Sequence, residues 1–496
     1  MHVYTYSVST LPTLSGIVLA LSTLILGQQT EETTKLPQAL PPGVLFPHQT
    51  CLADLEQSYA VYLPSQYTPA KKWPIVYAFD PAARGKLPVE LMKAAAEHYA
   101  YIVVGSNNSR NGSWRVEAEA AQAMLQDTHS RFSIDDRRVY FAGFSGGARV
   151  ASEIAQRCRC AAGVILSGAG FSVGSSPSRD VTFAVFSAVG NFDFNYPEVA
   201  RLDQKLEDSG FPHFFRSFEG THQWAPESTM DEALAWLRLV AMKQAREPHD
   251  DAFVAAQLAE ASARAHVLEQ AGVLFSAWRE YRQTAATFDG LADTSPLRQA
   301  VANLSLQKAV RDGAKHERQE FEEQDQLTGP ISAGLSSLRE LSTPRAETRS
   351  QIEQNIIALR ERAGHEKRPD KVRVLKRALG GILVEAMESG QERLEAKNLA
   401  LASDYFQLAS DADPDSSWAL SNLATTRALS GDRKGTLEAL RHVREKTKDP
   451  AAFSAWLNDE PAFAACAKTL SFVSCWQIPE TDTFRRFMRT RDQGPV

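Results

Sequence analysis

A serine in a glycine-rich turn is the first residue whose surroundings could do chemistry. Residues 139–151 read VYFAGFSGGARVA, an apolar run that ends in Gly-Phe-Ser-Gly-Gly and continues with helical spacing. A hydroxyl is a poor nucleophile unless a base lies beside it and aligned donors receive its developing charge. A sharp strand-to-helix turn meets both needs, and it leaves room only for very small residues at Gly143 and Gly147. The pattern predicts a nucleophile at Ser145; a glycine-rich turn without catalytic consequence is the alternative.

An acid and a base follow the serine, each at the end of a strand-like run. Asp193 follows the run 181–189, and His222 follows the run 213–218. Active sites of open α/β sheets lie at the carboxyl ends of the strands, so both side chains are expected beside Ser145. There His222 would take the serine proton and Asp193 would orient the imidazole. The plainer interpretations are an Asx turn for Asp193 and a polar loop position for His222.

Three other residues of suitable type are worse placed for this role. His213 begins its strand and so lies at the wrong edge of the sheet, and His249 lies at the end of the region. Asp180 precedes its strand instead of following it. The order serine, acid, histidine along the chain therefore favours Asp193 and His222.

The elements that must position these residues are short apolar runs that alternate with helical stretches between about residues 57 and 245. Several runs are apolar throughout, which is typical of strands covered by helices on both faces of a parallel sheet. The alternation predicts a doubly wound, mostly parallel α/β domain over residues 48–247. The runs are SYAVYL, WPIVYAF, YAYIVV, RVYFAGF, AAGVILSG, VTFAVFSAVG and HFFRSFEG.

After residue 247 the strand signals almost vanish, and residues 248–496 are predicted to form an all-α domain. One stretch, about 383–446, has the small and large residues at offsets that let antiparallel helices pack, which resembles a tetratricopeptide repeat. A generic helical hairpin is the alternative. Residues 252–312 are predicted to be helical as well, and residues 313–350 to be a linker or loop. The repeat positions are Ala402, Phe406, Ala409, Pro414, Ala424, Gly431, Asp432 and Leu440.

The N-terminal residues predict export. Residues 14–27 are an uncharged apolar run of the length of a signal-peptide core, within a leader or N-terminal anchor at residues 1–27. Residues 28–47 are rich in proline and are predicted to be a tether without regular structure. We expect a periplasmic or secreted protein, held at a membrane only if the first segment is retained.

Composition and cysteine count narrow the class of function. A formal net charge of −6 without a long basic run gives no indication of a nucleic-acid partner. No metal or organic cofactor is expected, because the sequence has no His-x-Glu-x-x-His, paired Cys-x-x-Cys or phosphate loop. Cys158 and Cys160 are too close for an easy disulfide with each other. Pairing of Cys51 with one of them, and of Cys466 with Cys475, would leave one thiol over.

With these residues in hand, the chain resembles the α/β-hydrolase superfamily, and in particular exported bacterial esterases of the polyhydroxybutyrate depolymerase and feruloyl-esterase type. The resemblance rests on the serine turn, on the acid after a Gly-x-x-Asp turn and on the Trp two residues beyond His222, and it covers about residues 51–245. It implies an oxyanion hole formed by the backbone N–H of Gly146 and a second N–H after the strand 73–79. Relatives have a His-Gly type sequence there, but this chain has DPAARG, so Ala82, or else Ala83, is the expected donor.

Three aromatic residues are candidates for the substrate pocket, although large aromatics more often serve in packing. Trp114 belongs to the polar loop 105–114, and Phe144 and Trp224 are neighbours of the predicted nucleophile and base. The resulting expectation is a serine hydrolase that cleaves a small-molecule or polymeric carboxylic ester through an acyl-enzyme. A peptidase of the same fold is one alternative. The other is a scaffold whose helical repeats bind a protein partner.

Overall fold

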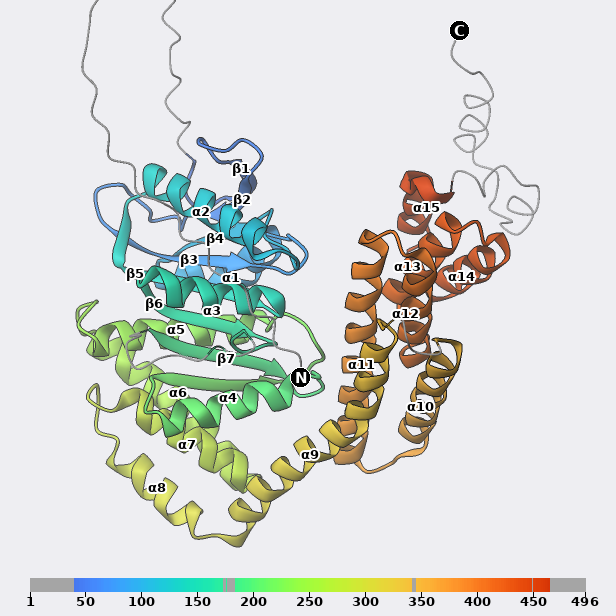
Figure 1. Ribbon diagram of the computed structural model, residues 1–496. Coiled ribbons are helices and arrows are strands. Elements are labelled where there is room, and N and C mark those ends of the chain that lie inside the picture. Colours follow the sequence, from blue (N-terminus) through green and yellow to red (C-terminus); the bar gives the residue numbers. More distant parts are fainter. Residues whose placement is uncertain (1–39, 173–174, 176–182, 341–344, 448, 464–496) are drawn as a thin grey trace, which may run out of the picture. The chain divides into compact units, whose positions relative to one another are not determined.

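One mixed sheet of eight strands organises the first half of the chain (Figure 1). The computed structural model describes residues 40–172, 175, 183–340, 345–447 and 449–463. Within the sheet the strand order is β1-β2-β4-β3-β5-β6-β7-β8. The pairs β1/β2 and β2/β4 are antiparallel, and all the others are parallel. The strands are β1 (Leu45–Thr50), β2 (Ser58–Tyr62), β3 (Trp73–Phe79), β4 (Ile102–Ser106), β5 (Ile134–Phe144), β6 (Ala161–Ser167), β7 (Ala184–Gly190) and β8 (His213–Phe218).

Helices cover both faces of this sheet. On one face α1 (Lys86–Tyr99) packs against α5 (Glu227–Lys243), and both join a hydrophobic core with Val76 and Ala78 of β3. Tyr77, between those two residues, points to the opposite face, where its hydroxyl is 2.8 Å from Thr128 Oγ1 of α2 (Trp114–Arg131). The helices α3 (Gly146–Cys158) and α4 (Tyr196–Asp208) contact the strands further along the sheet. Burial on both faces explains the uninterrupted apolar runs, and the predicted doubly wound α/β fold is confirmed.

The predicted tether at 28–47 is wrong at its C-terminal end, because β1 begins at Leu45. This strand lies at the edge of the sheet, and its pairing with β2 is interrupted between Phe46 and Gln49. Proline removes one backbone donor, which an edge strand tolerates because only one of its sides is paired. Pro47 therefore shortens the ladder at this edge without preventing the strand.

Beyond α5 the described chain is helical, as expected from the composition. A correction concerns residues 313–350, which were expected to form a linker: residues 308–337 are one helix, and another begins at Arg345. Burial of Ile331 and Leu335 in a core shared with the following helices outweighs the weak helix propensity around Pro330. The helices are α6 (Asp251–Gln270), α7 (Leu274–Phe288), α8 (Ser295–Ser305), α9 (Lys308–Ser337), α10 (Arg345–His365), α11 (Pro369–Glu395), α12 (Leu399–Ala412), α13 (Ser417–Leu429), α14 (Arg433–Lys446), α15 (Pro450–Asp459) and the 3-10 turn η1 (Pro461–Phe463).

The stretch with repeat-like spacing forms four consecutive helices, α11 to α14, each packed on the next. The predicted interior positions Ala402, Phe406, Ala409 and Ala424 are all fully buried. Gly390 of α11 leaves room for the Phe406 ring, since a Cβ there would lie 2.5 Å from that ring. These contacts establish close helix packing, whereas the tetratricopeptide assignment itself stays a prediction, as does the binding of a protein partner.

The cysteines pair differently from the expectation. Cys158 and Cys160 form a disulfide with each other, with Cα atoms 5.1 Å apart, and Cys51 is a buried free thiol. The intervening Arg159 has a positive φ of 53°, which turns the chain back at the end of α3 so that the two side chains meet. Cys466, Cys475 and the apolar segment 14–27 lie outside the described residues. No helix within the described ranges is long and apolar enough to cross a membrane.

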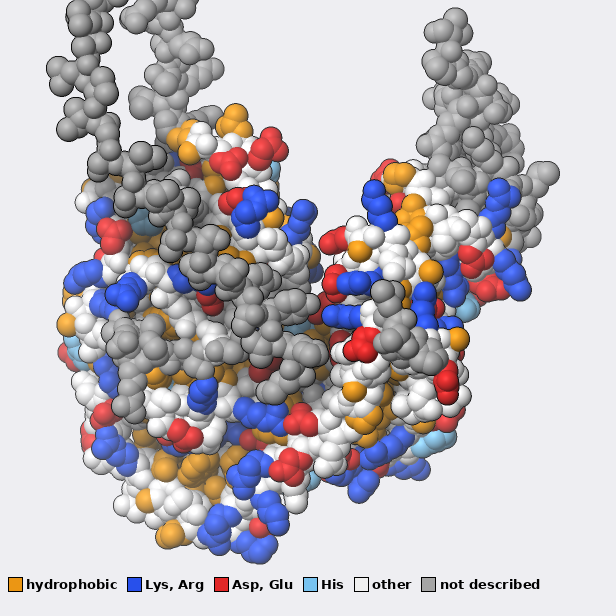
Figure 2. Space-filling view, in the orientation of Figure 1, with side chains coloured by type: hydrophobic (Ala, Val, Ile, Leu, Met, Phe, Trp, Pro, Cys, Tyr) orange, Lys and Arg blue, Asp and Glu red, His pale blue; other side chains and the backbone are white. Residues whose placement is uncertain are grey.

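Charged side chains of both signs mix on the surface. On the face drawn in Figure 2, Lys and Arg lie interspersed with Asp and Glu over the described elements. Many are paired; Arg264, for example, contacts Glu232, Glu260 and Glu280. A surface of this kind differs from the continuous basic stripe that tracks a nucleic-acid backbone.

Candidate active site

The turn between β5 and α3 has the geometry that the glycine pattern predicts. Ser145 has φ 53° and ψ −121°, a backbone conformation that residues other than glycine rarely adopt. Its N–H donates to Ser167 O at 2.9 Å. A Cβ on Gly143 would overlap the carbonyl of Gly147, and a Cβ on Gly147 would overlap the carbonyl of Phe79. The two glycines therefore permit a turn tight enough to raise the Ser145 hydroxyl above the sheet.

The structure brings Ser145, His222 and Asp193 together at the carboxyl ends of β5, β7 and β8. His222 Nε2 lies 2.8 Å from Ser145 Oγ, and His222 Nδ1 lies 2.9 Å from both carboxylate oxygens of Asp193. This is the hydrogen-bonded chain of hydroxyl, imidazole and carboxylate by which a serine can be activated. The competing residue His213 is instead held at the start of β8 by Asp203 and Glu207.

The loops that carry the acid and the base hold both side chains firmly. Asp193 is fully buried, and its Oδ1 also accepts the N–H of Asn195 at 2.8 Å. The imidazole of His222 contacts two phenyl rings, with centroids 4.7 Å away for Phe144 and 4.4 Å away for Phe194. Packing against these two tilted rings restricts rotation of the imidazole, so Nε2 stays directed at Ser145.

The loop after β3 differs from the expectation for Ala82. Its N–H donates to Asp80 Oδ1 at 2.9 Å, and the N–H of Ala83 donates to Asp80 O at 3.1 Å. Asp80 is fully buried and accepts two further side-chain donors: the Arg84 guanidinium in two bonds of 2.9 Å, and Trp224 Nε1 at 2.8 Å. The aspartate therefore organises this loop internally and occupies both candidate backbone donors.

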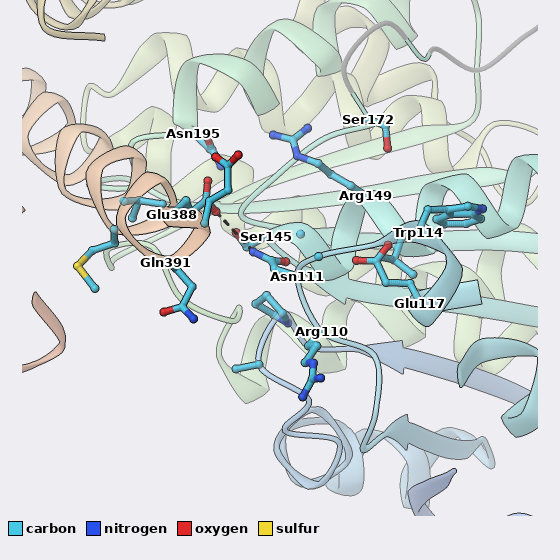
Figure 3. A pocket seen from close by; sticks show the side chains of 18 of the residues that line it. Arg110, Asn111, Trp114, Glu117, Ser145, Arg149, Ser172, Asn195, Glu388 and Gln391 are labelled. Carbon is cyan, nitrogen blue, oxygen red and sulfur yellow. Dashed lines mark hydrogen bonds between the residues drawn. The ribbon is translucent and has the colours of Figure 1, made fainter. Parts of the chain in front are cut away.

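Asn111 lies against the serine turn and lines the same cavity as Ala82. Its side-chain oxygen lies so close to Gly146 that a Cβ on this glycine would overlap it. Its Nδ2 is 3.5 Å from Glu388 Oε1, and its backbone N–H donates to Pro81 O at 2.9 Å. Figure 3 shows Asn111 directly beside Ser145. The amide group is thus placed next to the first N–H of α3.

A cavity of about 1100 Å³ opens in front of Ser145, and the helical half of the chain supplies one of its walls. Trp114 lines this cavity, as predicted for the substrate pocket, and so do Val384 and Met387 of α11. Figure 3 shows Glu388 and Gln391 of α11 on one side of Ser145, with Trp114 on the other. Phe144 and Trp224 line a second cavity of about 780 Å³ that also reaches His222. The three predicted aromatic residues therefore divide between two cavities.

Two glutamates that line the main cavity have raised pKa values. Glu117 is only 9% exposed, and burial raises its pKa to about 7. The pKa of Glu388 is raised as well, chiefly because the cavity withdraws its carboxylate from bulk water. Arg149, in contrast, is committed to a two-pronged pair with Glu198 at 3.0 and 2.9 Å. Among the described residues, no group of three or more His, Cys, Asp and Glu could hold a metal ion.

The sequence alone does not point to three residues near the site, Asn111, Asp80 and Glu388. They belong to no recognisable motif or lie far along the chain from Ser145. Asn111 belongs to the polar loop 105–114, of which only Trp114 was a candidate for the pocket, and nothing in the sequence distinguishes Asn111 from Asn107 or Asn108. Asp80 was noticed only as a departure from a family pattern. Glu388 follows Ser145 by more than 200 residues, so only the packing of α11 against the α/β region reveals it.

Comparison with known proteins gives likeness of structure only. No protein-family model and no curated protein matches the sequence. Among solved structures, S-formylglutathione hydrolase FrmB from Staphylococcus aureus is 13% identical, with a TM-score of 0.32 over 39% of this chain and 95% of that one. A ferulic acid esterase is 19% identical, with a TM-score of 0.32 over 37% of this chain and 92% of its own. The feruloyl esterase module from Clostridium thermocellum is 18% identical, with a TM-score of 0.31 over 40% and 91%.

Proposed function

We propose that this protein is a serine hydrolase that cleaves a carboxylic ester through an acyl-enzyme intermediate. One observation carries the proposal: the hydroxyl of Ser145 is 2.8 Å from His222 Nε2, while Asp193 binds the opposite nitrogen of the same ring. The hydroxyl also opens into a cavity large enough for a small substrate or for part of a longer one. The fold and the site together fit acyl transfer to serine better than a binding role alone.

In the proposed reaction Ser145 Oγ attacks the ester carbonyl carbon while His222 Nε2 accepts the hydroxyl proton. The tetrahedral intermediate then collapses, the bond to the alcohol oxygen breaks, and His222 returns the proton to the leaving alcohol. Water then attacks the carbonyl carbon of the acyl-serine and gives a proton to His222. The bond to Ser145 Oγ breaks, His222 returns the proton to that oxygen, and the carboxylic acid is released. Asp193 keeps Nε2 of the neutral ring available as the acceptor and stabilises the imidazolium that forms.

For the oxyanion we assign one donor to the backbone N–H of Gly146 and the second to the side-chain amide of Asn111. Two observations support the second assignment: the backbone N–H groups of Ala82 and Ala83 are bound to Asp80, and the Asn111 amide contacts Gly146. A half-turn of the amide exchanges its oxygen and nitrogen and places Nδ2 against the developing charge. A side-chain amide in this position contributes about 10²- to 10³-fold to kcat in serine hydrolases.

The proposed function is tested by covalent labelling and by ester turnover. The full chain should react with a fluorophosphonate probe and hydrolyse p-nitrophenyl esters, and Ser145→Ala should abolish both signals. Ser209→Ala, which removes an exposed serine hydroxyl at the end of α4, serves as the matched control and should behave like the wild type. Labelling of Ser145→Ala at the wild-type rate would exclude this nucleophile. A panel of acyl chain lengths and aryl acids then defines the preferred ester.

A further inference from the structure

The loop that carries Asp193 is joined by hydrogen bonds to the loop that carries His222. The N–H of Asn191 donates to Phe218 O at 2.8 Å, and that of Phe192 donates to Gly220 O at 2.9 Å. In return, the N–H of Gly220 donates to Asn191 Oδ1 at 3.2 Å. Any shift of Asn191 is therefore transmitted to the acid and to the base together.

Two side chains from the helical half hold this loop on either side of Asp193. Arg377 of α11 donates its Nε–H to Asn191 O at 2.7 Å, and Gln324 of α9 donates its Nε2–H to Phe194 O at 2.8 Å. Arg377 is 1% exposed and Gln324 is 7% exposed, so water does not compete for either bond. Asp193 thus lies between two backbone carbonyls, those of Asn191 and Phe194. Each is bound by a side chain more than 100 residues further along the chain.

Arg377 is itself held in a single position. Its guanidinium lies 3.9 Å from the centre of the Tyr196 ring, and its Nη1 lies 3.5 Å from Glu320 Oε2. Burial lowers its pKa to about 10, which leaves it charged at neutral pH. A planar guanidinium fixed by a ring on its face and by a carboxylate at its edge directs Nε–H at one point, which is the carbonyl of Asn191.

The contact at Phe194 reaches the catalytic histidine. The Phe194 ring packs on His222, with centroids 4.4 Å apart, and Gly381 of α11 lies against the same phenylalanine. A Cβ on Gly381 would approach Phe194 Cβ to 3.3 Å, which indicates how closely the helix passes. Gln324 therefore holds the backbone of a residue whose side chain bounds the imidazole.

We infer that Arg377 and Gln324 are positioning residues for Asp193, and that α9 and α11 are a built-in part of the catalytic unit. The inference rests on the proposed hydrolase function, because it assigns these residues a purpose in the same reaction. They touch neither Ser145 nor the cavity that receives the substrate, so they act through the acid loop. Displacement of a catalytic group by about 1 Å costs roughly 100-fold in rate, so loss of either bond should lower kcat more than it changes KM.

The test compares Arg377→Met with Arg373→Met in the full-length protein. Arg373 lies one turn earlier on α11 and also pairs with Glu320, but it makes no bond to the acid loop. We expect Arg377→Met to lower kcat for a p-nitrophenyl ester by about 10- to 100-fold with KM within about threefold of the wild type. Arg373→Met should keep kcat within about threefold. Gln324→Leu, which keeps the side chain's bulk, should reproduce the loss if Arg377→Met does not fold.

A double-mutant cycle with Asp193→Asn separates positioning from general damage. If Arg377 acts through the acid, Arg377→Met should cost almost nothing further once Asp193 is replaced. An equal loss in both backgrounds, or a folded Arg377→Met with wild-type kcat, would overturn the inference.

A second readout does not depend on turnover. The proton shared by His222 and Asp193 should give a far-downfield nuclear magnetic resonance signal in the wild type and in Arg373→Met. It should be lost or broadened in Arg377→Met. A wild type that shows this signal but neither labels nor turns over esters refutes the proposed function and leaves the positioning role measurable. If the wild type labels and turns over esters but Arg377→Met keeps the same proton signal, only the positioning role is refuted.

Discussion

At the scale of single residues, the loop after β3 is held together by a buried aspartate, Asp80, that the sequence resemblance does not predict. Asp80 stands where the sequence resemblance implies a His-Gly type sequence, and its carboxylate accepts hydrogen bonds from Ala82, Arg84 and Trp224. Charge-assisted bonds to a fully buried carboxylate are among the stronger hydrogen bonds in proteins. Asp80 thereby rigidifies the loop but engages the N–H groups that a motif-based prediction reserves for substrate. Trp224, a candidate for the substrate pocket, lines the second cavity and also donates its Nε1–H to this carboxylate.

Asn111 is the residue on which this interpretation is most easily tested. Replacing it by alanine should lower kcat about 100- to 1000-fold and change KM little, because the lost donor matters most when negative charge has developed on the oxygen. Steady-state kinetics with a p-nitrophenyl ester measure both constants. Asn108→Ala is the matched control, since that side chain binds Ser58 and Glu56 instead. Wild-type kcat in Asn111→Ala would contradict this assignment, and the second oxyanion donor would then be a backbone N–H of the DPAARG loop.

At the scale of elements, the sequence predicts most of the sheet for identifiable physical reasons. Each of the seven runs from SYAVYL to HFFRSFEG became a strand, and several of these strands are buried along their whole length. β1 escaped notice because Pro47 suggests an irregular segment. α9 was missed from residue 313 onwards because a charged stretch is followed there by Gly329 and Pro330. In both cases contacts with distant residues outweigh a local preference. The same limit applies to the site: Ser145, Asp193 and His222 carry local signals, whereas Arg377 is 186 residues away from the carbonyl it binds.

The junction of α4 and β8 should make stability depend on pH. His213 is buried beside Asp203 and Glu207, at 3.3 and 3.2 Å. Burial alone would lower its pKa, but bonds to these two carboxylates and to Phe211 O raise it to about 9. A raised histidine pKa means that the folded protein binds the proton more tightly than the unfolded chain. This stabilisation is complete below pH 6.5 and is lost as pH rises through 9.

We therefore expect wild-type stability to fall relative to His213→Gln between pH 6.5 and 9, by about 2–3 kcal/mol in total. Urea unfolding at a series of pH values measures this difference. His266→Gln, at an exposed histidine of α6, should show a constant difference from the wild type over the same range. A constant difference for His213→Gln as well would show that the fold does not raise the pKa of His213.

At the scale of the whole molecule, two hydrophobic clusters join the α/β region to the helices that follow it. Phe321 of α9 packs with Val189, Tyr196 and Phe215, and Val254 and Phe288 pack with Leu239 and Met242 of α5. A chain that ends near residue 247 would expose these apolar surfaces and would also lose Arg377 and Gln324. The helical half is therefore expected to contribute to folding and to catalysis, in contrast to a passenger or a separate adaptor.

Residues 46–247 alone should consequently show kcat at least about tenfold below that of the full chain, together with a lower Tm. Ester turnover and thermal unfolding monitored on the same preparations measure both quantities. A chain ending at residue 463 keeps all the helices described here and is the appropriate control, with turnover close to that of the full chain. Full activity in residues 46–247 would show that the site is complete without the helices.

The two borders of the sheet also bear on how the protein behaves in concentrated solution. On β1, Pro47 and the interrupted pairing remove the regular row of donors and acceptors that a further strand would need. On β8, the N–H of Phe215 donates to Gln283 Oε1 of α7 at 2.6 Å, so a side chain of the helical half occupies a donor of this edge strand. Sheets with free borders can grow by adding strands from other molecules. Here both ends of the strand order carry obstacles to such growth, and one of them is supplied by the helical half of the chain that also holds the acid loop.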